Sequence, residues 1–292
     1  MSRIKRILCG ARAQRIIFFA MLGASFCLLL NAGILPESRA AAGNVTELPI
    51  IMYHSVLRDS SRAGQYIVTP QTVESDLKYL KEHGYTAITA AELAQTVIKG
   101  EQLPEKPVMI TLDDGYLNNL TYVLPLLEKY DMKAVVSVVG SYCECFSQND
   151  DHNPAYAYLS WEDIDKLTAG GRVEIGNHTY DMHKRKERKG TKRMRGEDEA
   201  EYYAKLVCDI GRTQSLLEEN CGILPTTFAY PYGYISRESV PILQEMGFTA
   251  LLTCTEKVNE ISGDPAVLTS LGRFNRPSGI STEKFMRKIG IK

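Results

Sequence analysis

Two adjacent carboxylates are the first residues in the chain that suggest chemistry. Asp113 and Asp114 follow an apolar run from Val108 to Leu112 and precede Gly115. Neighbouring carboxylates beside a core repel each other and lose hydration, and a bound cation removes that cost. The same residues also occur in ordinary turns between a strand and a helix. The pair alone therefore leaves a turn and a metal site both open.

Two histidines supply the second part of a metal site. His178 and His183 follow another strand-like run, from Glu174 to Asn177. Residues five apart are separated by about 140° on a helix, so the two rings do not share a helical face. A loop must curl back to bring both onto one ion, and we expect the hydroxyl of Thr179 to tie that loop. One carboxylate, two imidazoles and an open position are typical of a catalytic zinc site, and the second carboxylate remains for chemistry.

A third apolar run, from Thr227 to Ala229, leads into a turn that contains Tyr230, Pro231, Tyr232 and Gly233. The chain thus carries three motifs in this order: Thr111-Leu112-Asp113-Asp114-Gly115, His178-Thr179-x-x-x-His183 and Tyr230-Pro231-Tyr232-Gly233. They resemble the motifs of the polysaccharide deacetylases (carbohydrate esterase family 4, the NodB homology domain), and the resemblance spans about residues 107 to 255. It implies a hydrolase that removes N-acetyl groups from a cell-wall or extracellular N-acetylhexosamine polysaccharide.

The resemblance also implies roles for the motif residues. Asp114, His178 and His183 would bind a divalent metal, for which we expect zinc, although cobalt, nickel and manganese also suit these ligands. Asp113 would be the base that takes the proton of the attacking water. The backbone N–H of Tyr232 would face the oxyanion. The division of labour between the two aspartates comes from the family motif, because the residues alone do not assign it.

Two departures from the common family plan bear on the proton donor and on the base. Many members have an arginine that orients the base aspartate, where this chain has Tyr230, and many have a C-terminal Leu-x-His that supplies the acid. No histidine follows His183 here. His54, which ends the run from Leu48 to Tyr53, resembles the acid of the permuted branch typified by poly-β-1,6-N-acetylglucosamine deacetylases. The alternative is a turn histidine without a role.

Two expectations follow, one about the arginine that orients Asp113 and one about the pKa of His54. Arg273 and Arg276 are candidates for the arginine that orients Asp113, and we expect at least one of them to lie at the surface. A histidine with a pKa near 6.5 is a poor acid at neutral pH. We therefore expect neighbouring carboxylates to raise the pKa of His54.

The first 42 residues do not belong to the fold. A basic leader precedes an apolar run from Ile16 to Leu35, and both Ser38-Arg39-Ala40 and Ala40-Ala41-Ala42 offer small residues at the spacing of a cleavage site. The run is also long enough to span a bilayer. We expect an exported protein, either secreted after removal of a signal peptide or anchored at the outer face of the cytoplasmic membrane, with no other membrane contact.

Charge narrows the class of partner. Residues 1–42 hold six of the 34 basic and one of the 35 acidic residues, which leaves 28 basic and 34 acidic ones and a net charge near −6. That balance argues against a nucleic-acid binder. The stretch from Lys184 to Arg195, with eight basic residues in twelve, is either a solvated loop or a patch for an anionic cell-wall polymer.

Five cysteines remain when residues 1–42 are left out, which is too few for a disulfide scaffold. A bridge between Cys208 and Cys221 stays possible.

Apolar runs alternate with helical patterns along the rest of the chain. Strands are predicted at 48–53, 108–112, 134–139 and 249–253, and helices at 71–83, 92–99, 120–130, 161–169, 196–219 and 237–246. This alternation predicts an α/β fold with a parallel sheet. Periodicity does not separate an open sheet from a closed barrel. The family resemblance implies a distorted (β/α)7 barrel, a single domain over 43–292, with every motif at the C-terminal end of its strand.

Two other functions stay open at this point. One is a catalytically silent carbohydrate-binding relative, and the other is an amide or ester hydrolase that uses the same metal site on a different substrate. A silent relative would be expected to lose a ligand or the base. Both aspartates and both histidines are present, which favours an enzyme.

Overall fold

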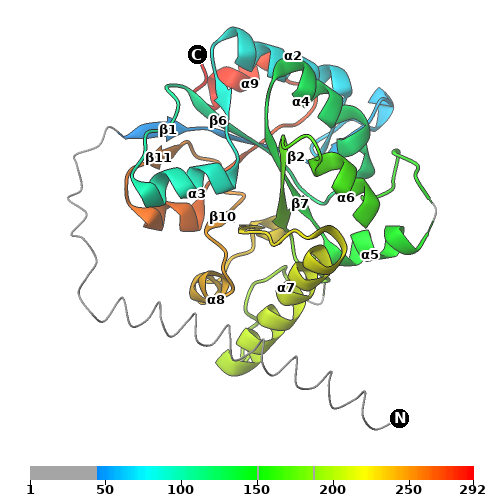
Figure 1. Ribbon diagram of the computed structural model, residues 1–292, viewed down its shortest axis with the longest axis vertical. Coiled ribbons are helices and arrows are strands. Elements are labelled where there is room, and N and C mark those ends of the chain that lie inside the picture. Colours follow the sequence, from blue (N-terminus) through cyan, green and yellow to red (C-terminus); the bar gives the residue numbers. More distant parts are fainter. Residues whose placement is uncertain (1–44, 150, 187) are drawn as a thin grey trace. The chain divides into compact units, whose positions relative to one another are not determined.

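A curled parallel sheet forms the centre of the protein (Figure 1). The computed structural model describes residues 45–149, 151–186 and 188–292, so the expected leader lies outside the described residues. Six strands follow one another across the sheet in chain order: β2 (Ile50–Tyr53), β6 (Pro107–Leu112), β7 (Ala134–Val138), β8 (Val173–Asn177), β9 (Thr227–Ala229) and β10 (Ala250–Leu252). The seventh, β12 (Phe274–Asn275), pairs with the other side of β2. An eighth strand, β5 (Thr86–Ala87), pairs beside the start of β6. The predicted parallel α/β architecture is confirmed.

Residues 271–275 close the sheet on itself. Leu271 forms a parallel bridge with Leu252 of β10, and Phe274 pairs in parallel with Ile51 of β2. Closure removes the unpaired edges that an open sheet would expose. The sheet is therefore a distorted barrel of seven parallel strands, as the family resemblance implied. The closing strand β12 was not among the predicted strands, because two residues are too few to form an apolar run.

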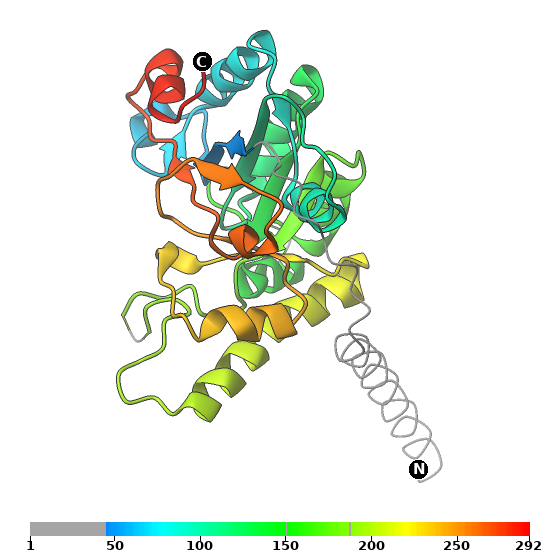
Figure 2. The ribbon, with the colours of Figure 1, turned by 90° about the vertical axis from the view of Figure 1, so that its left-hand side faces the viewer.

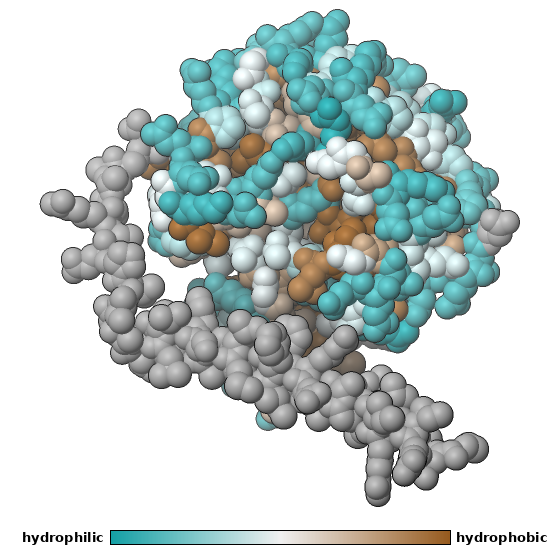
Figure 3. Space-filling model, in the orientation of Figure 1, coloured by the Kyte–Doolittle hydropathy of each residue, from teal (hydrophilic) through white to brown (hydrophobic). Residues whose placement is uncertain are grey.

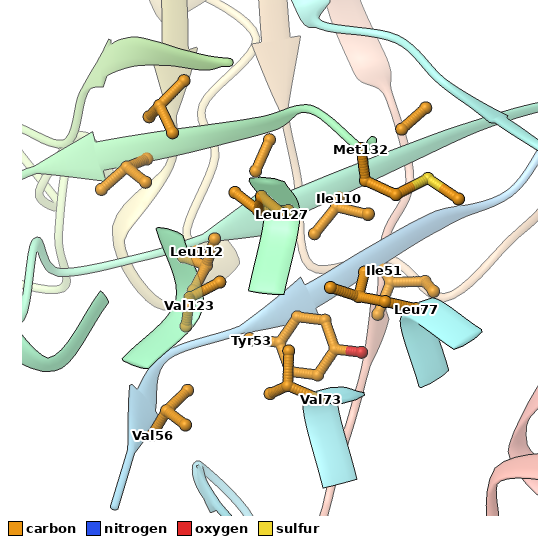
Figure 4. Packing of buried hydrophobic residues seen from close by; sticks show 14 of the residues in the cluster. Ile51, Tyr53, Val56, Val73, Leu77, Ile110, Leu112, Val123, Leu127 and Met132 are labelled. Carbon is orange, nitrogen blue, oxygen red and sulfur yellow. The ribbon is translucent and has the colours of Figure 1, made fainter. Parts of the chain in front are cut away.

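Alternation along β6 directs its side chains to two cores. Ile110 and Leu112 belong to the cluster that lies between the strands and helices α2 (Pro70–Glu82) and α4 (Leu124–Tyr130) (Figure 4). Met109 belongs to a separate cluster that includes residues of α3 (Ala90–Lys99). Since successive side chains on a strand point to opposite faces, Thr111 and Asp113 share the face of Met109. The first aspartate of the motif is thus directed away from the helices α2 and α4.

The predicted helices are all present, with shifted ends. The remaining helices are α5 (Gly140–Gln148), α6 (Trp161–Thr168), α7 (Glu199–Cys221), α8 (Ser239–Glu245) and α9 (Thr282–Lys288). The helix predicted at 120–130 is divided into a π-helical turn, η2 (Asn119–Val123), and α4, where Pro125 lies in the first turn of α4 and lacks the N–H that would continue the ladder. The helix predicted from 196 begins later because the side chain of Asp198 caps α7 by accepting the N–H groups of Ala200 and Glu201.

Short elements complete the fold. They are β1 (Thr46–Leu48), β3 (Ser55–Val56), β4 (Ile67–Val68), β11 (Asn259–Ile261), η1 (Ser60–Arg62), η3 (Pro231–Gly233) and η4 (Pro265–Ser270). Strand β1 pairs with β11 in the antiparallel direction. Helices α7 and α8 pack side by side (Figure 2). The face shown in Figure 3 is mostly hydrophilic, with hydrophobic residues gathered near its middle.

The structure also bears on disulfide bonds and on membrane-spanning helices. The five cysteines of the described residues are all free. Cys208 and Cys221 lie thirteen residues apart on α7, which corresponds to about 20 Å along a helix, so the bridge between them does not form. Within residues 45–149, 151–186 and 188–292, no helix is both long enough and apolar enough to cross a membrane.

Candidate metal centre and active site

The motif residues gather where the strands end. Asp113 and Asp114 follow β6, His178 follows β8, Tyr232 lies in η3 after β9, and His54 follows β2. Parallel strands of a barrel end on the same face, and the loops that leave them are adjacent. Residues far apart in the sequence can therefore contribute to one site.

Three side chains converge on a single point. The Nε2 atoms of His178 and His183 lie 3.5 Å and 3.1 Å from Oδ1 of Asp114. One ligand atom from each residue lies within 4.8 Å of the others. Asp114 has a φ of 75°, in the left-handed region that non-glycine residues rarely adopt and that clusters at functional sites.

The donor atoms of this cluster fit a divalent metal. Nδ1 of His178 lies 2.7 Å from the carbonyl oxygen of Ala229, which can only accept, so Nδ1 carries the proton and Nε2 presents its lone pair. Oδ1 of Asp114 is buried without a hydrogen-bond partner among the described residues. Burial raises the pKa of Asp114, but the two histidines hold it far below its usual range. A carboxylate oxygen that faces two imidazole nitrogens is a donor set that suits a divalent metal ion.

The second aspartate has a different partner. Asp113 is buried and receives two hydrogen bonds from Arg273, at 2.7 Å to Oδ1 and 2.8 Å to Oδ2. The same guanidinium also donates to Oγ1 of Thr111 and to the carbonyl of Thr253. Burial raises the pKa of Asp113, but the charge and hydrogen bonds of Arg273, together with the nearby histidines, outweigh burial and leave this pKa below its usual range. Asp113 is therefore ionised and fixed in orientation.

The other candidate arginine lies elsewhere. Arg276 binds Asp76 through two hydrogen bonds of 2.7 Å and 3.1 Å. Both arginines are buried, at 0% and 2% exposure, so the expectation that at least one lies at the surface is wrong. Each neutralises a buried carboxylate that would otherwise lack a partner of opposite charge. Tyr230, at the position of the usual family arginine, points its hydroxyl to Ser239 instead.

His54 lies in a desolvated position beside the aspartates. Its Nδ1 is buried and has no hydrogen-bond partner among the described residues, and its ring meets the edge of Tyr66 at 4.9 Å. Burial lowers the pKa of His54 and outweighs the opposing effect of Asp113 and Asp114. The expectation that carboxylates raise this pKa above the ordinary value is therefore wrong.

The loop between the metal-site histidines is held by a side chain that accepts one of its backbone N–H groups. The hydroxyl of Thr179 is buried without a hydrogen-bond partner in the described part of the chain, so the role expected for it is wrong. The side chain of Asn177 instead accepts the N–H of Thr179 at 2.8 Å. Thr179 has a φ of 74°, which turns the chain sharply after β8.

Tyr232 contacts a metal-site histidine through its side chain. Its hydroxyl lies 3.2 Å from both Nδ1 and the carbonyl oxygen of His183, and the two rings are 4.5 Å apart. The guanidinium of Arg185 lies over the ring of Tyr232, 4.4 Å from its centroid. The φ of Tyr232 is 57°. That its backbone N–H faces an oxyanion stays a prediction.

Sequence reasoning missed a group of tyrosines beside the site. The rings of Tyr116 and Tyr158 stack at 4.7 Å, and Tyr142 lies 4.4 Å from Tyr158 and 6.1 Å from the ring of His183. Tyr116 directly follows the Asp-Asp-Gly motif, which was the one available signal. The others come from α5 and from the loop before α6, and only the fold brings them here.

Comparisons with known proteins identify several similar chains. The chain is 23% identical over 250 residues to the poly-beta-1,6-N-acetyl-D-glucosamine N-deacetylase of Escherichia coli K12, a match that covers 78% of this chain but 37% of that protein. It is 26% identical over 219 residues to the enzyme of the same name from Staphylococcus aureus MRSA252, covering 74% and 72%. The solved structure of IcaB from Ammonifex degensii matches with a TM-score of 0.66 and 28% identity, covering 80% of this chain and 92% of that one.

A family model also matches this chain. The model described as polysaccharide deacetylase matches residues 100–251, which is just over half of the 292 residues. This range contains both aspartates, both metal-site histidines and the turn around Tyr232. The chain belongs to the polysaccharide deacetylase family.

Proposed function

We propose that this protein is a metal-dependent hydrolase that removes N-acetyl groups from a β-linked N-acetylhexosamine polymer. The observation that carries the proposal is that the two aspartates have different partners. Asp114 faces two imidazole nitrogens, and Asp113 is held by Arg273. A silent relative would not need both arrangements. Poly-β-1,6-N-acetylglucosamine is the substrate that we propose, because the E. coli and S. aureus relatives carry that name.

The proposed metal is zinc, held by Asp114, His178 and His183. When bound, it would polarise the acetyl carbonyl and lower the pKa of a water molecule toward neutrality. Asp113 would take the proton of the attacking water, and Arg273 keeps this carboxylate ionised and aimed. The backbone N–H of Tyr232 would donate to the oxyanion.

His54 is the proposed acid for the departing amine. Its buried Nδ1, without a partner among the described residues, supports a role beyond that of an ordinary turn residue, because a buried polar atom without a hydrogen bond carries a free-energy cost. Burial lowers the pKa of His54, so its protonated form dominates only at acidic pH. If His54 acts in this way, turnover falls as the pH rises through that lowered pKa.

Two surfaces beside the metal centre would hold the polymer. The tyrosines at 116, 142 and 158 present ring faces and edges of the kind on which sugar rings stack. The basic stretch from Lys184 to Arg195 adjoins the metal centre through Arg185, which lies over Tyr232. We propose that this stretch contacts an anionic cell-wall polymer associated with the substrate. Deacetylated amines would be repelled from it, which would favour release of the product.

We further propose that the protein acts outside the cytoplasmic membrane. The support is the basic and apolar leader over residues 1–42, and the substrate class agrees with it. Fractionation of cells that express the chain, followed by determination of the N-terminus, would test this. Recovery of the chain in the cytoplasm with its leader intact would contradict the proposal.

Acetate release tests the proposed reaction. Equal concentrations of β-1,6-linked N-acetylglucosamine oligomers, chitooligosaccharides and peptidoglycan would be incubated with the protein and zinc. We expect the β-1,6-linked oligomers to be the best substrate. Release from peptidoglycan alone would transfer the proposal to a different polymer, and release from none of them, with metal bound, would contradict it.

A further inference from the structure

The loop that joins the two metal-site histidines is clamped from two sides. On one side, the first turn of α5 donates to its carbonyls: the N–H of Gly140 lies 2.9 Å from the oxygen of Thr179, and the N–H of Ser141 lies 3.1 Å from the oxygen of Tyr180. A side chain at position 140 would collide with Thr213, because a Cβ there would lie 2.3 Å from its Oγ1. The close approach of α5 to α7, which brings α5 against this loop, therefore requires glycine.

A single carboxylate on α7 holds the other side of the loop. Oδ1 of Asp209 accepts the N–H of Tyr180 at 2.8 Å, and Oδ2 accepts the N–H of Asp181 at 2.9 Å. These two residues lie midway between His178 and His183. Hydrogen bonds from backbone N–H groups to an ionised carboxylate are short and strong. Asp209 thus fixes both peptide planes at the middle of the loop.

Arg212, a second residue of α7, helps to fix the side chain of Tyr180 at the middle of the loop. Arg212, one turn beyond Asp209, lies over the ring of Tyr180 at 3.8 Å and donates to Glu144 of α5 at 3.0 Å. Glu144 in turn accepts the hydroxyl of Tyr180. The loop therefore lies between α5 and α7, and Asp209 accepts the N–H groups of the two residues at its middle.

We infer that Asp209 is a positioning residue that holds His178 and His183 at the separation needed to bind one metal ion. The inference rests on the proposed metal-dependent function. A binding site that is already ordered does not have to lose loop entropy when the ion arrives. Because the loop holds one ligand at each end, freeing its middle would let His183 move away from Asp114 and weaken metal binding.

Zinc affinity tests the inference in the 292-residue chain. Asp209→Ala removes both acceptors, and Asp209→Asn keeps the shape but replaces one acceptor by a donor that faces an N–H group. Glu219→Gln removes the same charge from an exposed position on α7 and serves as the matched control. Affinity would be measured by competition with a chromogenic chelator. We expect a loss of about 10–100-fold for both Asp209 variants, as for other residues that orient metal ligands, and none for Glu219→Gln.

Amide hydrogen exchange on the metal-free chain separates this inference from the proposed function. We expect the amides of Tyr180 and Asp181 to exchange faster in Asp209→Asn, while Val136 of β7 keeps its protection and reports an intact barrel. Unchanged exchange at both loop amides, or zinc affinity equal to that of the parent, would overturn the inference. If the parent binds no zinc, the proposed metal site fails, and exchange alone still decides whether Asp209 orders the loop. If Asp209→Ala does not fold, Asp209→Asn carries both measurements.

Discussion

Replacement of Arg273 by lysine isolates what the guanidinium does for Asp113. Lysine keeps the positive charge but cannot reproduce the two parallel hydrogen bonds of 2.7 Å and 2.8 Å. A hydrogen bond to a charged group contributes about 1.5–3 kcal/mol, and we expect Arg273→Lys to lose roughly that amount of stability. Displacement of the base by about 1 Å costs on the order of 100-fold in turnover.

The pH profile gives this variant its clearest signature. Asp113 must be ionised to act as a base, and Arg273 holds its pKa below the usual value against the opposing effect of burial. With these hydrogen bonds lost, burial is opposed less strongly and the pKa of Asp113 rises, so the acidic limb of the rate profile moves toward neutral pH. The stability that the ionised carboxylate contributes is present above its unfolded pKa and is lost as the pH falls through the folded pKa. In Arg273→Lys the folded pKa lies closer to the unfolded pKa, so this contribution is smaller and its loss is complete at a higher pH.

A second buried pair provides the control. Arg276 and Asp76 form a two-point ion pair of the same kind, so Arg276→Lys should cost similar stability in urea unfolding. It should leave the acidic limb where it is, because Asp76 takes no part in the reaction. Acetate release across the pH range would be measured for both variants. Equal profiles for the two, or an unshifted profile for Arg273→Lys, would refute the role that we give to Arg273.

Three further substitutions have distinct expected outcomes. Asp113→Asn should keep the metal but lose about 10²–10⁴-fold in turnover, as expected for a missing base, whereas Asp114→Asn should lose the metal; equal metal loss in both would show a shared ligand pair. His54→Ala should keep the metal and abolish the decline of turnover on the alkaline side. The loss of turnover should be smaller on an activated aryl acetate than on an N-acetyl sugar, because its leaving group needs less protonation; equal losses on both substrates would remove His54 from the reaction. Tyr142→Ala should raise KM for the oligomer and leave zinc affinity unchanged, and an unchanged KM would exclude this ring from the polymer surface.

The sequence predicted the parts of the fold that local patterns encode. Apolar runs such as residues 134–138 and amphipathic segments such as α2 follow from periodicity alone. Barrel closure does not, because β12 has two residues, and its pairing with β2 depends on a contact across more than 200 positions. The boundaries of α4 and α7 moved because a proline and a capping aspartate overrode the helical pattern.

In the site too, local motifs could be predicted from the sequence and long-range contacts could not. The aspartates and histidines stand in short motifs that the sequence displays directly. The choice between Arg273 and Arg276 could not be made from the sequence, because both lie in one short stretch, and only the fold shows which faces Asp113. The pKa of His54 was predicted in the wrong direction, since the charges of two carboxylates are readable from a motif but burial is not. Asp209 gave no signal at all, because it lies in a long polar helix.

One measurement tests the central claim that Asp114, His178 and His183 hold the metal on which N-deacetylation depends. The chain and its His178→Ala variant would be stripped of metal, returned to one equivalent of zinc, and assayed for bound zinc and for acetate release from β-1,6-linked N-acetylglucosamine oligomers. We predict that the parent is inactive without metal, binds one zinc and regains activity, and that the variant does neither. Full zinc occupancy in the variant, or acetate release by the metal-free parent, would contradict the account.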